Sequence, residues 1–153
     1  MIKLLLTIAL LCIAFAGSAE GYNRTDFNYQ SYKPSTSIGF YTNQSCDFIN
    51  IDHIVSLKDA YDSGAAPWSA PEKEVFANDR SNHVPSCGRV NSSKGSAGPK
   101  DFLRRSNDGK GLEYEIVRFC EYVQRYYAVK AEYGLSFNAN DRATFQGCGV
   151  RIR

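Results

Sequence analysis

The stretch DFINIDHIVSL, residues 47–57, alternates apolar and polar side chains and is rich in residues that favour extended backbone. This pattern predicts a β-strand. Two polar residues, Asp52 and His53, lie within this mostly apolar stretch and need an explanation. A buried carboxylate or imidazole must be paired, hydrogen-bonded or bound to a metal to offset its lost hydration. Taken alone, the dipeptide is more often a structural pair than a reactive one. The segments that follow are therefore needed to interpret it.

The chain after this strand predicts a helix, a returning strand and a broken segment. Ser69-Ala70-Pro71-Glu72 has the serine and glutamate spacing of a capping box, so a helix is expected from there to about Asn78. Residues 83–87 favour a second strand. Residues 88–99 are expected to form a loop or a short helix that two glycines and Pro99 interrupt.

The C-terminal part predicts two further helices. Apolar residues recur at three- and four-residue spacing over residues 112–133, and Gly134 follows, so the longest helix is expected there. Asn140 or Asp141 has the side chain to cap a last short helix that ends near Gly147. This mixture of strands and helices predicts an α+β fold.

The N-terminal region divides into two parts by composition. Residues 1–19 combine a lysine, a short apolar run and small residues before a cleavage point near Ala19, which is the pattern of a secretory signal peptide. The apolar run is too short to span a bilayer comfortably, so we expect no membrane anchor and a secreted or periplasmic product. Residues 20–45 are polar and rich in tyrosine, which predicts an irregular arm packed on a main domain at residues 46–153.

Four cysteines remain once the predicted signal peptide is removed, and an exported protein meets an oxidising compartment. Two disulfides are therefore expected, while their pairing stays open because four cysteines allow three connectivities. No Cys-x-x-Cys pair is present among them, which argues against a structural zinc knuckle. The four are Cys46, Cys87, Cys120 and Cys148.

Charge is nearly balanced over the whole chain, with 18 lysines and arginines against 16 aspartates and glutamates. The chain as a whole is therefore no polycation. Residues 89–105 are locally basic, and such a patch suits a phosphate backbone as well as it suits a solvated surface. The residues expected to contact phosphates are Arg89, Lys100, Arg104 and Arg105.

The order of the polar motifs points to a known family. Asn82 precedes the expected second strand, and Asn91-Ser92-Ser93-Lys94-Gly95 follows that strand. Together with Ile51-Asp52-His53-Ile54-Val55 on the first strand, these motifs resemble the signature of the HNH, or ββα-metal, endonucleases. The chain is most similar to small secreted bacterial members of that family, over roughly residues 51–133.

The resemblance implies a ββα-metal core, in which a β-hairpin is followed by a helix, with supporting helices and stabilising disulfides. Two departures from the family pattern are visible. Ser56 stands where the family usually has proline, and Ser96 where an aspartate commonly follows the Lys-Gly pair. Neither departure removes a residue that the family uses for metal binding or proton transfer.

Hydrolysis of a phosphodiester requires a deprotonated water and a cation near the developing negative charge. Asp52 and Asn91 offer two hard oxygen ligands, which suit Mg²⁺, with Mn²⁺ as an alternative. His53 lies on the opposite side of the strand and is expected to be the general base, with its other ring nitrogen held by a backbone carbonyl. The resemblance implies the same assignments.

Two further residues complete the expected site. By resemblance, Asn82 hydrogen-bonds across the hairpin and holds the strand that presents His53. Lys94 lies one helical turn after Asn91, where a catalytic ammonium can contact the scissile or a neighbouring phosphate, and a solvated surface lysine is an equal alternative. His83 is expected to be a packed or exposed bystander.

The leading hypothesis is a monomeric secreted endonuclease that hydrolyses DNA, with RNA open as a second substrate. Little sequence preference is expected, because no recognition module is attached. The alternative is a catalytically inactive, disulfide-stabilised domain with an HNH-like fold that binds nucleic acid or protein. A zinc hydrolase of another class is disfavoured, because the chain's 2 histidines form no His-x-x-x-His pair.

Overall fold

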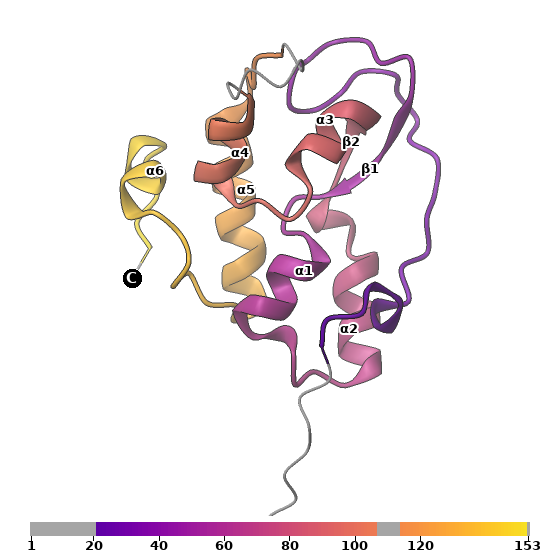
Figure 1. Cartoon of the computed structure of the whole chain (residues 1–153), viewed down its shortest axis with the longest axis vertical. Coiled ribbons are helices and arrows are strands. Elements are labelled where there is room, and N and C mark those ends of the chain that lie inside the picture. The colour runs from indigo at the N-terminus through magenta and orange to yellow at the C-terminus, as the bar shows by residue number, and fades with distance from the viewer. Residues whose placement is uncertain (1–20, 107–113, 153) are drawn as a thin grey trace, which may run out of the picture.

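The computed structural model describes residues 21–106 and 114–152, leaving out the side chains of residues 103–106 (Figure 1). The predicted signal peptide, residues 1–19, lies outside the described residues. Over the described ranges the fold is mixed α/β, with a two-stranded antiparallel sheet. No helix within these ranges is long and apolar enough to cross a membrane.

The hairpin confirms the two predicted strands. β1 (Ile49–His53) pairs with β2 (His83–Cys87) in a register that sets His53 opposite His83. α3 (Gly88–Lys94) follows β2 directly and packs against the hairpin (Figure 1). Two helices, Leu57–Ala60 and Ala70–Asn78, separate the strands along the chain, and α3 follows the second strand, which is the position that the family resemblance implies.

The helix caps read from the sequence are also present. α2 (Ala70–Asn78) begins at Ser69, which forms the reciprocal capping box with Glu72. β1 is shorter than predicted, because the Ser56 hydroxyl accepts a hydrogen bond from the Asp59 N–H at 3.0 Å and starts α1 (Leu57–Ala60). A π-helical turn at Tyr61–Ala65 and a 3₁₀ turn at Arg80–Asn82 complete the segment between the two strands.

The predicted start of the longest helix is wrong. α5 (Phe119–Glu132) begins seven residues after the predicted position 112. Ile116 is 7% exposed although it precedes the helix, and the Tyr114 hydroxyl donates to Ser93 Oγ at 2.8 Å. Apolar spacing thus continues into the non-helical residues 114–118, which serve the same core, and periodicity alone does not distinguish such a segment from helix.

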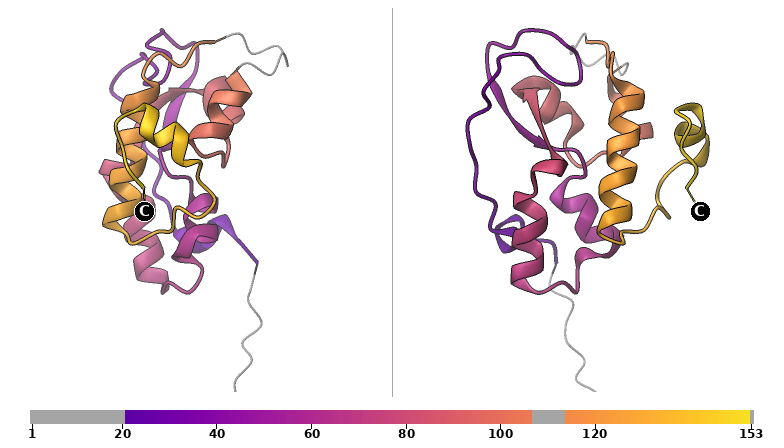
Figure 2. Two further views of the ribbon diagram at one scale, coloured as in Figure 1. Left: turned by 90° about the vertical axis from the view of Figure 1, so that its left-hand side faces the viewer. Right: turned by 180° about the vertical axis from the view of Figure 1, so that it is seen from behind.

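Two more helices cover the C-terminal side. Pro99 begins α4 (Pro99–Ser106) and does not interrupt a helix, because the first turn has no intrahelical use for the missing N–H. α6 (Arg142–Gly147) starts at Asp141, whose carboxylate accepts from the Thr144 N–H at 3.0 Å, so Asp141 is the cap of the two candidates. Figure 2 shows α6 on the outer side of α5, away from the hairpin.

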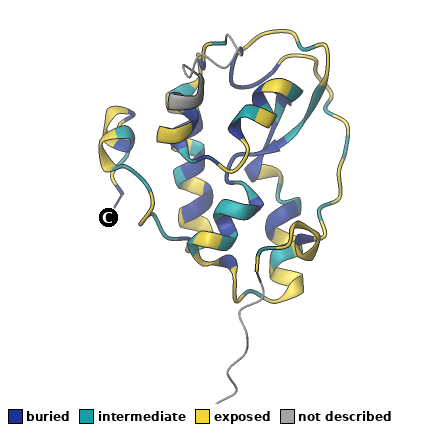
Figure 3. Cartoon of the chain, viewed as in Figure 1, coloured by how far each residue is buried: buried dark blue, intermediate teal, exposed yellow. Residues whose placement is uncertain are grey.

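The N-terminal arm packs into the core. Apart from a 3₁₀ turn at Arg24–Phe27 and one isolated bridge, it has no regular structure, yet Phe27, Phe40 and Tyr41 are all buried (Figure 3). Two disulfides are present, as expected. The Cys46–Cys87 disulfide joins the residue directly after the arm to β2, and the Cys120–Cys148 disulfide joins α5 to the residue after α6.

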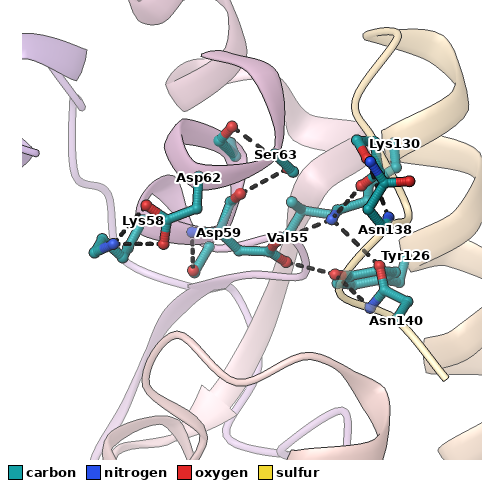
Figure 4. Close-up of polar contacts among 12 residues, drawn as sticks. Val55, Lys58, Asp59, Asp62, Ser63, Tyr126, Lys130, Asn138 and Asn140 are labelled. Atoms are coloured by element: carbon teal, nitrogen blue, oxygen red, sulfur yellow. Dashed lines mark hydrogen bonds and ion pairs between the residues drawn. The ribbon is translucent and has the colours of Figure 1, made fainter. Parts of the chain in front are cut away.

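A buried polar cluster joins α1 to α5 (Figure 4). Lys130 is 1% exposed, and its Nζ lies 2.9 Å from Asp59 Oδ1 and donates to Ser136 O at 3.0 Å. The Tyr126 hydroxyl donates to Asp59 Oδ2 at 2.5 Å and accepts from Asn140 Nδ2 at 3.2 Å. Since every charge has a partner, this cluster fixes α1, which follows the site-bearing strand.

Tyr126→Phe is expected to lower the free energy of unfolding by about 1.5–3 kcal/mol, because it removes a hydrogen bond to the partly buried carboxylate of Asp59. The matched control is Tyr29→Phe. The Tyr29 hydroxyl is buried without a hydrogen-bond partner among the described residues, so its removal should cost less than about 0.5 kcal/mol. Denaturant unfolding measures both values, and equal losses would contradict the assignment of the cluster.

Candidate active site

A buried carboxylate near the end of β1 anchors the candidate site. Asp52 is 5% exposed, and its Oδ2 accepts from the Tyr41 hydroxyl at 2.5 Å and lies 3.0 Å from Lys94 Nζ. Burial, and then the Asp52 charge, raises the pKa of Tyr41 well above its usual range, so the phenol stays protonated and donates. The arm, β1 and α3 therefore converge on one carboxylate.

Of the two alternatives for Lys94, the solvated surface position is wrong. The residue is 0% exposed, and its Nζ also donates to the backbone carbonyl of His53 at 2.8 Å. α3 packs on β1, so the last turn of the helix directs this side chain under the hairpin, where the Asp52 carboxylate compensates its charge. The ammonium thus lies against Asp52 and not at the solvent-facing position that a phosphate contact requires.

His53 is buried on the other face of β1. Its Nε2 lies 2.8 Å from Ala77 O, and the Tyr29 ring meets the imidazole edge-on at 4.6 Å between centroids. His83 approaches from β2, with its Nε2 3.2 Å from that of His53 and 2.9 Å from the same carbonyl. A neutral His53 that donates Nε2–H to Ala77 O keeps a lone pair on Nδ1, which is the form a general base needs.

Burial is the main cause that lowers the pKa of His53 to about 3; the Ala77 hydrogen bond opposes the shift, and nearby His83, Arg24 and Lys94 add to it. Because the unfolded value is about 6.5, this histidine contributes stability above that pH and loses it as the pH falls. Between about pH 7.5 and pH 5, the free energy of unfolding should drop by about 2 kcal/mol from this group alone. Denaturant unfolding in chelator measures the drop.

The matched variant for this pH dependence is His53→Asn. It should lose about 2 kcal/mol less than the wild type over the same interval, because the titrating imidazole is gone. His83 remains in both proteins, and burial lowers its pKa too. The free energy of unfolding of both proteins should therefore still decrease as the pH falls. Parallel curves for the two proteins would show that His53 is not buried in its neutral form.

Three of the predicted site residues line one cleft. Asp52, His53 and Asn91 all border a cavity of about 260 Å³, which Arg24 and Lys58 also line. Asn91 donates from Nδ2 to Asn50 Oδ1 at 3.0 Å, which leaves its own Oδ1 as the amide atom that can face a cation. The strand end and α3 thus bring two oxygen donors and one imidazole to the same opening.

These donors suit a hard cation held by few protein ligands. Within the described residues, no group of three or more histidine, cysteine, aspartate or glutamate side chains is arranged to hold a metal. The Asp52 carboxylate and the Asn91 amide oxygen match the preference of Mg²⁺ for oxygen, with water and phosphate oxygens completing its shell. Because Lys94 shares the carboxylate, such binding is expected to be weak.

Asn82 has the geometry expected of it. It is 0% exposed, and its side chain accepts from the Val55 N–H at 2.8 Å and donates to the Val55 carbonyl at 3.0 Å. Its own carbonyl accepts from the Ile54 N–H at 2.8 Å. These bonds extend the pairing of the two strands beyond His53 and fix the backbone of Ile54 and Val55, directly after β1.

The predicted phosphate contacts do not gather at the cleft. Arg89 is exposed but borders a separate cavity beside Phe48, and Lys100 borders another, 3.8 Å from the Asp141 carboxylate. Both lie off the cleft because α3 and α4 direct them to other faces. The side chains of Arg104 and Arg105 lie outside the described residues. The basic groups that do line the cleft, Arg24 and Lys58, were not predicted.

Sequence reasoning missed three further residues that contact the predicted site residues: Asn50, His83 and Tyr41. Asn50 had a readable signal, because it lies two residues before Asp52 and so on the same face of the strand. His83 had one too, since the hairpin register sets it opposite His53. Tyr41 had none, because its contact with Asp52 depends on how an irregular arm folds back.

The family model described as "GmrSD restriction endonucleases, C-terminal domain" matches residues 12–144. A protein from Arthroderma benhamiae named "Uncharacterized secreted protein" is 31% identical over 97 residues, which cover 62% of this chain and 43% of that protein. The chain thus spans less than half the length of that relative. No solved structure matches. Since the family match covers most of the chain, the chain belongs to the HNH-type family of GmrSD restriction endonuclease C-terminal domains.

Proposed function

We propose that the chain is a secreted, metal-dependent endonuclease that hydrolyses the phosphodiester bonds of DNA, and of RNA as a second substrate. The observation that carries the proposal is the cleft where the neutral imidazole of His53 meets the oxygen donors of Asp52 and Asn91. Membership of a restriction endonuclease family supports the same reaction. The two disulfides and the secreted relative support export.

His53 is the proposed general base. Its Nδ1 accepts the proton of the attacking water, while Nε2–H stays on Ala77 O and keeps the ring oriented as it becomes charged. Tyr29, edge-on to the ring, further restricts its rotation. Because burial keeps the imidazole neutral, no prior deprotonation is needed at neutral pH.

Asp52 and Asn91 would hold a divalent cation, Mg²⁺ or alternatively Mn²⁺, which when bound stabilises negative charge on the phosphate. Lys94 and Tyr41 orient the Asp52 carboxylate, and Asn50 orients the Asn91 amide. Arg24 and Lys58 line the cleft at the position where flanking phosphates would approach. Contacts of this kind read the backbone, so little sequence preference is expected.

The test is incubation of the purified, disulfide-bonded protein with supercoiled plasmid and with RNA, in Mg²⁺, Mn²⁺ or chelator. Nicking and linearisation are expected with either cation and none with chelator. Asn91→Ala should raise the Mg²⁺ concentration for half-maximal cleavage about tenfold or more, because it removes one of two protein ligands. Asn138→Ala, an exposed asparagine away from the cleft, is the control and should leave that concentration unchanged.

A non-catalytic binding domain is the second candidate, and one observation favours it. The Lys94 ammonium already neutralises the Asp52 carboxylate, as expected of a structural ion pair. This candidate predicts that the protein retains nucleic acid without cutting it. Cleavage that persists in chelator or is unchanged in Asn91→Ala would contradict the metal assignment, and absence of any cleavage would favour the binding domain.

A further inference from the structure

The two histidines of the chain meet across the hairpin at a third polar atom. His53 Nε2 and His83 Nε2 are 3.2 Å apart, and they lie 2.8 Å and 2.9 Å from the carbonyl oxygen of Ala77. The imidazole planes are nearly perpendicular, at 88°. Three atoms that carry, or can carry, lone pairs therefore converge on one point beneath the surface.

The separation of these atoms suits a single metal ion. Zinc–nitrogen bonds of about 2.0–2.1 Å at a tetrahedral angle require two nitrogens roughly 3.3–3.4 Å apart, close to the observed 3.2 Å. A circle through the two nitrogens and the carbonyl oxygen has a radius of roughly 1.7 Å, shorter than the bond, so one ion just outside their plane reaches all three. Little movement of the chain is needed.

We propose that His53, His83 and the Ala77 carbonyl form a site for a borderline transition metal such as Zn²⁺ or Cu²⁺. Two imidazoles favour these ions, whereas the oxygen donors Asp52 and Asn91 favour Mg²⁺. Because Asp52 and His53 are consecutive on β1, their side chains leave opposite faces of the strand. The two metal sites are therefore separate, although both adjoin the same cleft.

The surroundings of the pair suit a bound ion. A neutral imidazole that binds a metal through Nε2 carries its ring proton on Nδ1, so each histidine needs an acceptor near Nδ1 and not a second deprotonation. The Tyr32 hydroxyl lies 3.3 Å from His83 Nδ1 and can accept the proton that metal binding at Nε2 leaves there. Of the charged groups around His83, Asp52 and Asp79 favour a positive charge at the imidazole, whereas Arg80 disfavours it.

An ion can reach the pair from two sides. His53 lines the cleft of about 260 Å³ at the candidate active site, and His83 lines a second cavity of about 600 Å³ beside Tyr32 and Arg80. The histidines themselves are 4% and 7% exposed, so an ion bound there is largely shielded from solvent. Shielding of this kind favours slow release over a loose surface association.

Occupation of the site has a consequence that rests on the proposed nuclease function. A neutral imidazole has one ring proton, and a metal on His53 Nε2 forces that proton onto Nδ1. Nδ1 then has no lone pair with which to accept a proton from water. The bound transition metal is therefore a reversible inhibitor, even when Mg²⁺ is present.

The first experiment measures binding and does not depend on activity. Zn²⁺ alone is added to the ¹⁵N-labelled wild-type protein, whose 2 histidines give a simple imidazole spectrum. Nε2 signals of both histidines should shift together to metal-bound values at one equivalent, with the proton on Nδ1. Unshifted signals, or a shift of one histidine only, would overturn the proposal and leave a hydrogen-bonded pair.

The second experiment separates this site from the active site. By equilibrium dialysis, His83→Asn should weaken Zn²⁺ binding about tenfold or more, whereas Asn91→Ala should leave it unchanged. In Mg²⁺, Zn²⁺ should inhibit plasmid cleavage by the wild type, and the same Zn²⁺ concentration should inhibit His83→Asn less, each rate being taken relative to that of the same protein without Zn²⁺. Equal inhibition of both proteins would overturn the proposal. If neither cuts, the nuclease proposal fails while the spectra still decide the metal site.

Discussion

His53→Ala is expected to lower the rate of DNA cleavage by about 10²–10⁴-fold, because a positioned general base contributes that much to proton transfer. The loss should appear in the maximal rate, with little change in the Mg²⁺ concentration required, since Asp52 and Asn91 remain. Cleavage of supercoiled plasmid at saturating Mg²⁺ measures it. Tyr29→Phe keeps the ring beside the imidazole and serves as the control, with activity close to wild type.

Chemical rescue makes this test specific to the base. Imidazole added to the buffer should restore part of the activity of His53→Ala, because the deletion enlarges the cleft in which the side chain stood. The same addition should not restore Asp52→Ala, which keeps its histidine. If wild type and His53→Ala cut alike, or if imidazole stimulates both variants equally, His53 is not the base.

Most of the site-bearing framework was predictable because its signals are local. The capping box at Ser69 and the two strands depend on residues close in sequence, and the structure confirms them. Elements of this kind are set by hydrogen bonds that the nearby chain must satisfy. The pairing of Asn82 with Val55 is not local, since 27 residues separate the two, and it was expected from the family resemblance.

The remainder was not predictable because it depends on contacts between distant segments. Tyr41 reaches Asp52 only when the irregular arm folds over the hairpin, and no periodicity encodes that path. For Lys94, a solvated surface position and a phosphate contact were equal alternatives, since a lysine in a short helix is usually solvated. Its burial follows from the packing of α3 on β1, which the motif spacing does not reveal.

The same three residue types occur in two buried clusters. Tyr41, Asp52 and Lys94 form one, and Tyr126, Asp59 and Lys130 form the other. In both, a phenol donates to the carboxylate at 2.5 Å and an ammonium lies within about 3 Å of it. Such clusters are a way to bury a carboxylate, so the cluster alone does not mark an active site. What distinguishes the first is the imidazole of His53 and the amide of Asn91 at the same cleft.

Lys94→Met is therefore expected to lower the free energy of unfolding by about 3–5 kcal/mol, because it leaves the Asp52 carboxylate buried without its ammonium. Lys130→Met breaks the other buried pair and should cost a similar amount. Denaturant unfolding in chelator measures both. A loss below about 1 kcal/mol for Lys94→Met would show that its ion pair is screened by water.

Mg²⁺ should stabilise Lys94→Met more than it stabilises the wild type. In Lys94→Met the cation meets no competing ammonium at Asp52, so it should raise the unfolding midpoint more than it does in the wild type, by mass action on the folded state. Adding Asn91→Ala to Lys94→Met should abolish this gain, because the second oxygen donor is lost. If Mg²⁺ stabilises the single and the double variant equally, Asp52 and Asn91 do not share a cation, and the metal half of the proposed mechanism is wrong even if His53 proves to be the base.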